Sequence, residues 1–124
     1  MSSAQIPVTV TTASGRITGV RRDGLHYFHS VRYSTIPSPY SPAEPLDGAF
    51  DQDAREPRPN DIALSITAPA DAAECPVVVY IHGGRFEHGS HEDPRLTGTK
   101  NARHGVVQVN VGYRVGLAGF ARFD

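Results

Sequence analysis

Two adjacent glycines in the second half of the chain follow a histidine and an apolar run. The run covers residues 77–81, and His82, Gly83, Gly84 and Arg85 come directly after it. Glycines reach positive φ without a Cβ clash, so they let neighbouring backbone N–H groups approach one oxygen atom. Preorganised donors of this kind stabilise the oxyanion of acyl transfer, each by about 3 to 4 kcal/mol. The loop could therefore support acyl transfer, although a plain strand-terminating Gly-Gly turn explains the same two residues.

The sequence around this loop resembles the type-B carboxylesterases, which include para-nitrobenzyl esterases and cholinesterases. Two stretches carry the resemblance in the right order: residues 82–90 (HGGRFEHGS), and residues 109–120 (VNVGYRVGLAGF), which match the family's Asn-Tyr-Arg-Leu-Gly segment. Residues 60–66 are similar to its Glu-Asp-Cys-Leu strand, and residues 15–33 resemble its N-terminal hairpin. The resemblance covers nearly the whole chain. It implies an α/β-hydrolase fold and a serine esterase that uses neither metal nor cofactor.

The resemblance also assigns roles to individual residues. Gly84 and Arg85 would supply N–H groups to an oxyanion hole, Gly83 would shape the loop, and His82 would support it. The family usually has Gly or Ala at the position of Arg85, so here a residue with a Cβ must adopt the loop conformation. A third donor would follow the catalytic serine.

Two further departures from the family lie before the second strand of this region. The family cysteine is absent between Asp61 and Leu64, which fits a reduced, bacterial-type enzyme. Asn60 replaces a glutamate that commonly pairs, in relatives, with the arginine matching Arg114. We expect Asp61 to pair with Arg114 instead.

The spacing Gly-x-Ser-x-Gly, which marks the nucleophile of this fold, is missing. Two pairs of glycines have the required separation of four, but their central residues are Ile17 and Arg114 rather than serine. Four residues after Gly84 the chain has His88 in place of the second glycine. Hydrolysis on this fold requires a serine, an acid and a histidine. We therefore expect no catalytic residue in this chain, and no activity from it alone. It would be either a truncated product or one piece completed by a separate polypeptide.

The N-terminal half predicts strands and irregular chain. Residues 8–33 alternate and are broken at Gly15 and at Asp23-Gly24, which predicts short antiparallel strands joined by tight turns. Six prolines between residues 36 and 59 predict irregular chain laid over a surface.

The second half predicts the elements that must position the loop. Residues 62–67 alternate with period two and predict a strand with one buried face. Residues 77–81 are continuously apolar, which is typical of a parallel strand covered on both faces. Residues 93–104 could form a crossover helix before a strand at 106–111. We predict an α/β fold: residues 1–124 form the incomplete N-terminal portion of one carboxylesterase domain, with no second domain. Its mixed, mostly parallel sheet is preceded by an antiparallel hairpin.

The fragment interpretation has a consequence for residues 77–81. In the family this strand lies beside the strand that carries the nucleophile, which this chain lacks. It should therefore keep an unpaired, apolar edge. Such a chain should be poorly stable or self-associating.

Three alternatives to esterase chemistry fit parts of the sequence less well. Ser90 beside His88 or His91 superficially suggests a nucleophile and a base, but loop neighbours seldom have the geometry of a triad. A set of six residues has ligand chemistry for a divalent metal, although a polar loop beside a substrate gorge explains it better: His82, Glu87, His88, His91, Glu92 and Asp93. A non-catalytic, esterase-like binding module is the other alternative, and the lack of a secretory signal argues against it.

Composition excludes several partners. The 12 Lys and Arg residues and 13 Asp and Glu residues leave a formal net charge of -1, so no positive field attracts nucleic acid or an anionic membrane. No apolar stretch approaches the roughly 20 residues that span a bilayer. Cys75 is the only cysteine, which excludes an intrachain disulfide. We expect a cytoplasmic location and a small-molecule ester as the substrate of the complete enzyme.

Overall fold

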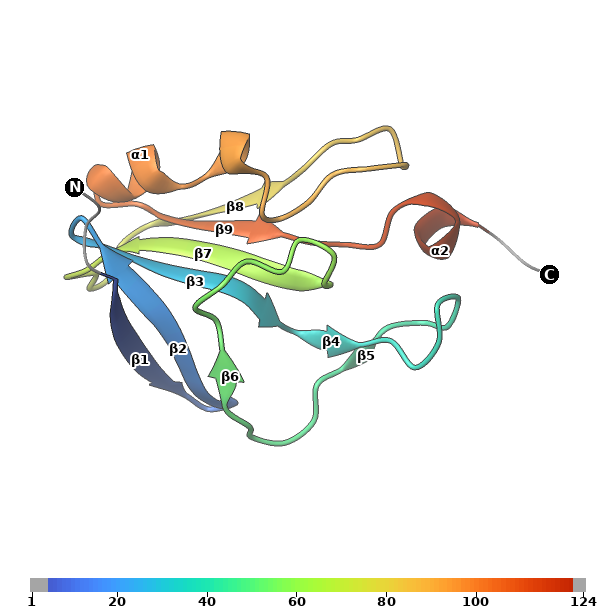
Figure 1. Cartoon of the computed structure of the whole chain (residues 1–124), viewed down its shortest axis with the longest axis horizontal. Coiled ribbons are helices and arrows are strands. Elements are labelled where there is room, and N and C mark those ends of the chain that lie inside the picture. The colour runs from blue at the N-terminus through green and yellow to red at the C-terminus, as the bar shows by residue number, and fades with distance from the viewer. Residues whose placement is uncertain (1–4, 122–124) are drawn as a thin grey trace.

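The computed structural model describes residues 5–121. Most of their strands form one twisted mixed sheet with a short helical crossover on one face, and two short strands pair in a separate sheet (Figure 1). The strand order is β1-β2-β3-β7-β9-β8, and β6 pairs with β2 outside this path. The main strands are β1 (Ile6–Thr12), β2 (Gly15–Arg22), β3 (Leu25–Arg32), β7 (Ala63–Pro69), β8 (Val77–Ile81) and β9 (Val107–Val111). The short elements are β4 (Ser34–Thr35), β5 (Glu44–Pro45), β6 (Gln52–Asp53), η1 (Pro94–Leu96), α1 (Thr99–Arg103) and α2 (Gly116–Phe120).

The three N-terminal strands form the predicted antiparallel meander. Strand β1 pairs with β2 through a turn before Gly15, and β2 pairs with β3 through a turn at Asp23 and Gly24. Both turn residues of the second hairpin have positive φ, 50° at Asp23 and 77° at Gly24, as the mirror-image hairpin turns require. The prediction for residues 8–33 is confirmed.

Strand β3 contains a β-bulge where it pairs with β7. Phe28 faces Ile66 and Val31 faces Leu64, so two residues of β3 oppose one residue of β7. The second of the two, Ser30, has a φ of 55°. A bulge re-aims side chains and frees ladder groups, and this one turns Ser30 towards the loop that follows β8.

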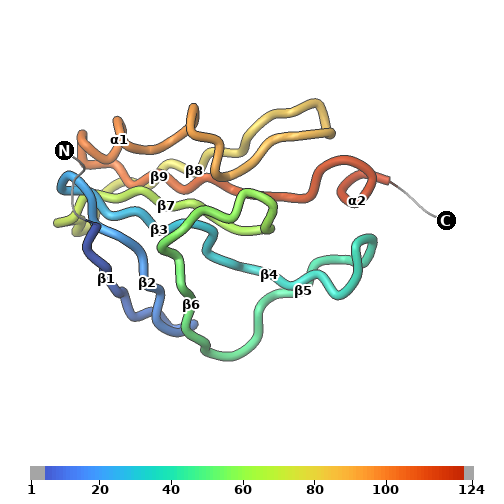
Figure 2. Tube along the Cα trace, in the orientation of Figure 1, coloured from blue at the N-terminus to red at the C-terminus, as the bar shows by residue number. Residues whose placement is uncertain are grey.

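The apolar core lies on one face of the sheet and is closed by the proline-rich segment. Phe28, Val31 and Ala54 are buried, and four partly buried residues pack against them: Val8, Ile17, Leu64 and Ile66. Ala54 N–H donates to the Thr18 carbonyl at 2.7 Å, and His29 N–H donates to the Ala54 carbonyl at 2.7 Å. The segment is largely irregular, as predicted, but it closes the core as well as lying on the surface (Figure 2).

The opposite face of the sheet holds a buried polar layer beneath the crossover. Gln108 and Asn110 are 8% and 6% exposed, and each donates from its side-chain amide to the Leu96 carbonyl at 2.9 Å. Asn101 donates to Gln108 Oε1 at 2.8 Å. These amides supply hydrogen bonds to the carbonyl at the end of η1 and so fix the crossover to the sheet. Buried polar groups need such partners.

The sheet is mixed, as expected, but the prediction that it is mostly parallel is wrong for the described residues. Within residues 5–121 antiparallel pairs predominate, and the parallel pairs are β8–β9 and the short β2–β6 contact. Two parallel strands need a crossover connection between them. The segment with η1 and α1 is the crossover that connects β8 to β9. The longer of the two parallel pairs, β8–β9, is the one that this crossover connects.

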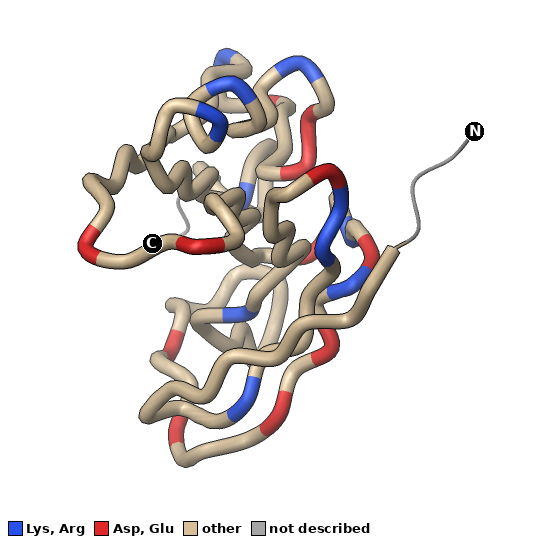
Figure 3. Tube along the Cα trace, turned by 90° about the vertical axis from the view of Figure 1, so that its left-hand side faces the viewer, with Lys and Arg blue, Asp and Glu red and all other residues tan. Residues whose placement is uncertain are grey.

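Charges of both signs are interspersed along the chain (Figure 3). This arrangement agrees with the near-zero net charge of -1. Among the described residues, no helix is long and apolar enough to cross a membrane.

Strand β8 lies at the edge of the sheet and pairs only with β9 among the described residues. All five of its residues are exposed, and Val79 and Ile81 are 59% and 68% exposed. The predicted unpaired apolar edge is confirmed. The prediction of a strand covered on both faces is wrong within the described residues, because all five residues of β8 are exposed.

An exposed apolar edge without charge is a template for pairing with another chain. We expect Val79→Lys to reduce self-association, because a charge on β8 disfavours edge-to-edge pairing. The measurement is analytical ultracentrifugation, with circular dichroism to verify the fold. Ala73→Lys, at an exposed residue between β7 and β8 and outside both edge strands, is the control and should leave association unchanged. Equal association of the two variants would exclude β8 as the contact.

Candidate functional site

The loop after β8 begins with a left-handed turn. The Gly84 carbonyl accepts hydrogen bonds from the N–H groups of Glu87 at 3.0 Å and His88 at 3.2 Å. The two residues inside the turn, Arg85 and Phe86, have φ of 55° and 68°. Left-handed backbone costs a residue with a Cβ about 1 to 2 kcal/mol. The turn is therefore strained at two consecutive residues.

Gly84 is required at its position. Its φ is 148°, and a Cβ there would lie 1.6 Å from the His88 carbonyl oxygen. No side chain can be accommodated without opening the turn. Gly83 next to it has open space around its Cα, so of the two glycines Gly84 is the one that the geometry demands.

The backbone donors of the turn are unused by the rest of the described chain. The N–H groups of Gly84 and Arg85 make no hydrogen bond to another residue in 5–121. Gly83 and Gly84 line a cavity of about 410 Å³, together with His82, His88, Gly89, Asp93, Arg95 and Leu96. Gly84 is half-buried and Arg85 is exposed, so water or a ligand can reach these donors. Two adjacent donors of this kind are therefore available to an external oxygen atom.

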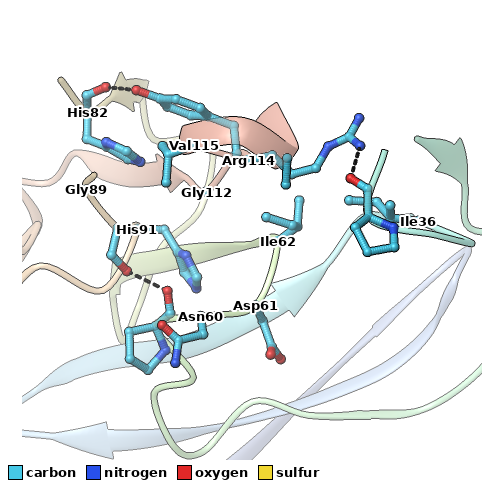
Figure 4. A pocket seen from close by; sticks show the side chains of 15 residues that line it. Ile36, Asn60, Asp61, Ile62, His82, Gly89, His91, Gly112, Arg114 and Val115 are labelled. Atoms are coloured by element: carbon cyan, nitrogen blue, oxygen red, sulfur yellow. Dashed lines mark hydrogen bonds between the residues drawn. The ribbon is translucent and has the colours of Figure 1, made fainter. Parts of the chain in front are cut away.

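His82 holds the near end of the loop. It is 5% exposed, and its ring stacks on Tyr113 with centroids 4.2 Å apart and planes 11° apart. The Tyr113 hydroxyl donates to the His82 carbonyl (Figure 4). His82 Nδ1 lies 2.7 Å from the Gly83 carbonyl and must carry the proton, because a carbonyl only accepts. The remaining nitrogen, Nε2, is buried without a partner among the described residues.

Three consecutive residues hold the far end of the loop. Ser90 Oγ donates to the Pro59 carbonyl at 3.0 Å. His91 Nε2 lies 3.0 Å from Ser30 Oγ. Glu92 accepts from Ser30 N–H at 3.0 Å and contacts His29 Nδ1 at 2.9 Å.

These contacts separate the residues of the alternative hypotheses. Ser90 bonds to a carbonyl and His91 to Ser30, so neither forms the nucleophile and base pair considered above. Within residues 5–121 no group of three His, Cys, Asp or Glu residues is arranged to hold a metal ion. The six residues that suggested metal ligands are instead spread along the loop: His82 at its near end, Glu87 and His88 in the Gly84 turn, and His91, Glu92 and Asp93 at its far end.

The predicted pairing of Asp61 with Arg114 is wrong. Arg114 Nη1 donates to the carbonyls of Ser41 at 2.7 Å and Pro39 at 3.2 Å. Both side chains line a pocket of about 360 Å³, but they point in different directions (Figure 4). Arg114 satisfies its donors on the carbonyls of the proline-rich segment, whose place in the fold the sequence does not reveal.

Sequence reasoning also missed Ser30 and His29. His29 is 14% exposed at its side chain and pairs with Glu92. Neither residue belongs to a recognisable motif, and their role arises from the bulge in β3. A bulge in this place leaves no signal in an alternating strand pattern.

His91 is neutral and carries its proton on Nε2. Ser30 Oγ accepts from Arg58 N–H at 2.7 Å, and its one hydrogen can go to the Arg58 carbonyl at 3.1 Å or to Glu92 Oε1 at 3.3 Å. His91 Nδ1 has no acceptor among the described residues, so the ring proton belongs on Nε2, which donates to Ser30 Oγ. Nδ1 of His91 is buried without a partner among the described residues and packs against Gly112. Burial lowers the pKa of His91 below its usual 6.5, against the opposing charges of Glu92 and Asp61.

This lowered pKa predicts acid sensitivity. Below pH 6.5 the unfolded chain binds a proton at His91 that the folded chain resists, so the free energy of unfolding falls as pH falls. Above pH 6.5 the contribution is complete. We expect urea unfolding between pH 7.5 and about 5 to show this fall, and His91→Gln to flatten it. His26, whose pKa burial also lowers, remains in both proteins. Equal slopes in the two proteins would contradict the assignment.

The strain at Arg85 predicts a stabilising substitution. Arg85→Gly should raise the free energy of unfolding by about 0.5 to 1 kcal/mol, because glycine adopts positive φ without a Cβ clash. Urea unfolding measures the change. Arg103→Gly, the same replacement inside α1, is the control and should destabilise by a similar amount. A loss of stability in Arg85→Gly would show that the side chain contributes more than the strain removes.

A family model described as the Carboxylesterase family matches residues 37–124. The para-nitrobenzyl esterase of Bacillus subtilis (strain 168) is 30% identical over 138 residues, which cover 90% of this chain and 28% of that protein. Lipase 1 of Yarrowia lipolytica (strain CLIB 122 / E 150) is 28% identical over 145 residues, covering 91% of this chain and 30% of the lipase. The chain spans less than a third of the length of these relatives.

Solved structures agree with these relatives. Carboxylesterase EST55 of Geobacillus stearothermophilus matches with a TM-score of 0.81 at 32% identity, over 90% of this chain and 27% of the esterase. Juvenile hormone esterase of Manduca sexta matches with a TM-score of 0.84 at 24% identity, over 94% of this chain and 28% of that chain, which concerns the fold alone. These structures are α/β-hydrolase esterases. The chain therefore belongs to the carboxylesterase family and carries the N-terminal part of its α/β-hydrolase fold.

Proposed function

We propose that this chain supplies the oxyanion loop of a carboxylic-ester hydrolase of the serine class. Gly84 and Arg85 provide the backbone N–H donors, and Gly83 shapes the approach to them. The observation that carries the proposal is the pair of adjacent donors without an acceptor in residues 5–121, beside a cavity of about 410 Å³.

The chemistry follows from where charge develops. Attack on an ester carbonyl places negative charge on its oxygen, and donors about 2.7 to 3.1 Å from that oxygen lower the barrier. Donors that are already fixed need no reorganisation during the reaction. Here the turn is fixed internally by the two hydrogen bonds to the Gly84 carbonyl, and His82 holds its start against Tyr113.

The nucleophile, its acid and its histidine come from outside residues 1–124 in this proposal. The sequence has no Gly-x-Ser-x-Gly, and Ser30 and Ser90 are hydrogen-bonded to backbone carbonyls. The free edge of β8 offers a place for the strand that leads to the nucleophile. The remainder of the domain is either further chain or a separate polypeptide, and the substrate is a small-molecule ester hydrolysed without a cofactor.

The proposal predicts two kinetic results. The 124-residue chain alone should not turn over p-nitrophenyl acetate. In the polypeptide that joins this chain to the nucleophile, Gly84→Ala should lower kcat about 100- to 1000-fold, because the Cβ opens the turn and displaces the donors. Gly48→Ala, at a positive-φ glycine with open space around it, is the matched control and should retain activity. Turnover by the chain alone, or full activity of Gly84→Ala, would refute the proposal.

A further inference from the structure

The far end of the loop is attached to a buried polar cluster at the bulge of β3. Ser30 and His91 are each 2% exposed, and Ser30 Oγ lies 3.0 Å from His91 Nε2. Glu92 Oε1 lies 3.3 Å from Ser30 Oγ and 3.8 Å from His91 Nε2. The cluster therefore contains a serine, a histidine and a carboxylate within contact distance.

This cluster is not a second catalytic triad. In a triad the carboxylate binds the imidazole nitrogen that faces away from the serine. Here Glu92 lies on the same side as Ser30, and Nδ1 of His91 packs against Gly112. Both ends of the Ser30 hydroxyl are engaged with Arg58, and no substrate can reach a side chain that is 2% exposed.

The bulge makes the attachment possible. It withdraws Ser30 from the ladder with β7 and directs its N–H to Glu92 Oε1 at 3.0 Å. Ser30 adopts a φ of 55°, where glycine would fit with less strain. Glycine has no hydroxyl, whereas the Ser30 hydroxyl bonds to Arg58 in the proline-rich segment and to His91 in the loop.

The loop itself depends on its two ends. Residues 85–88 are exposed, so little of the described protein packs around the middle of the loop. The internal supports there are the Gly84 turn, a hydrogen bond from Gly116 N–H to the Phe86 carbonyl at 2.6 Å, and the edge-to-face ring pair of Phe86 and Phe120. The near end follows β8, an edge strand. The far end at residues 90–92 is the one that reaches the interior strand β3.

We propose that Ser30 and His91 are positioning residues for the oxyanion loop: their buried hydrogen bond fixes the far end of residues 82–92 and thereby orders the donors at Gly84 and Arg85. The inference rests on the proposed function of those two donors. Neutral His91 donates from Nε2 to Ser30. The titratable groups that face it are Glu92 beside it, Asp61 before β7, His82 after β8 and His29 on β3.

Ser30→Gly is the discriminating variant. It removes the hydroxyl and relieves the positive φ, so a merely local structural role predicts unchanged or improved order. The proposal predicts that the NMR order parameters of the Gly84 and Arg85 amides fall from about 0.85 to below about 0.6, while amides of β7 and β9 keep theirs. Glu74→Gly relieves a similar positive φ of 54° at an exposed residue before β8 and outside the loop, so it is the control and should leave the loop ordered.

Two replacements of His91 test the proposal independently of Ser30→Gly. His91→Gln keeps a side-chain N–H donor near the Nε2 position and should retain the order of Gly84 and Arg85. His91→Leu removes the donor and should loosen these amides as Ser30→Gly does. Unchanged order in both Ser30→Gly and His91→Leu would overturn the proposal, and so would equal loosening in His91→Gln and His91→Leu.

These measurements are made on the 124-residue chain and do not use activity. If the loop loosens as stated but Gly84→Ala has no effect on ester hydrolysis, the positioning role holds and the proposed function fails. If Gly84→Ala abolishes hydrolysis but the loop keeps its order in Ser30→Gly and His91→Leu, the function holds and the positioning role fails.

Discussion

The structure of this region depends on keeping two adjacent backbone donors free. A backbone N–H normally finds an acceptor, and leaving it unpaired away from water is costly. The left-handed turn at Gly84 keeps these donors apart from the described chain, because it uses the carbonyl of the same residue to close itself. The strain at Arg85 and Phe86 is the local cost of that conformation. Such strain persists only where the surroundings impose it, so the turn requires support from both of its ends.

The two faces of the sheet stabilise the chain through different interactions. One face buries an apolar core around Phe28 and Val31, which stabilises the strands by removing apolar area from water. The other face carries amides such as Gln108 and Asn110, which bind the crossover through directional hydrogen bonds. Apolar contact is not directional, whereas hydrogen bonds fix an orientation. The loop begins and ends near the face with the hydrogen-bonded amides, and hydrogen bonds of this kind can fix the orientation of its backbone donors.

Local patterns in the sequence predicted the parts of the fold that depend on neighbours in the chain. The hairpins, the strand at 77–81 and the position of the glycine loop follow from runs and turns of a few residues, whereas the free edge of that strand follows from the family resemblance. The contacts that pin the loop join residues about 30 to 60 positions apart, as from Ser30 to Arg58 and His91. Nothing local specifies these pairs. The same limitation explains the wrong pairing of Asp61, because Arg114 binds carbonyls of an irregular segment that no periodic pattern could place.

The two ends of the loop differ in what they can withstand. The near end follows β8, whose one partner in the described sheet is β9 and whose faces are exposed. An edge strand of this kind opens at lower free energy than interior strands do. The far end is attached to β3, which lies between β2 and β7. Fluctuations of β8 therefore reach the donors from one side, while the bulge on β3 restrains them from the other. A further strand paired to the free edge of β8 would restrain the near end of the loop as well.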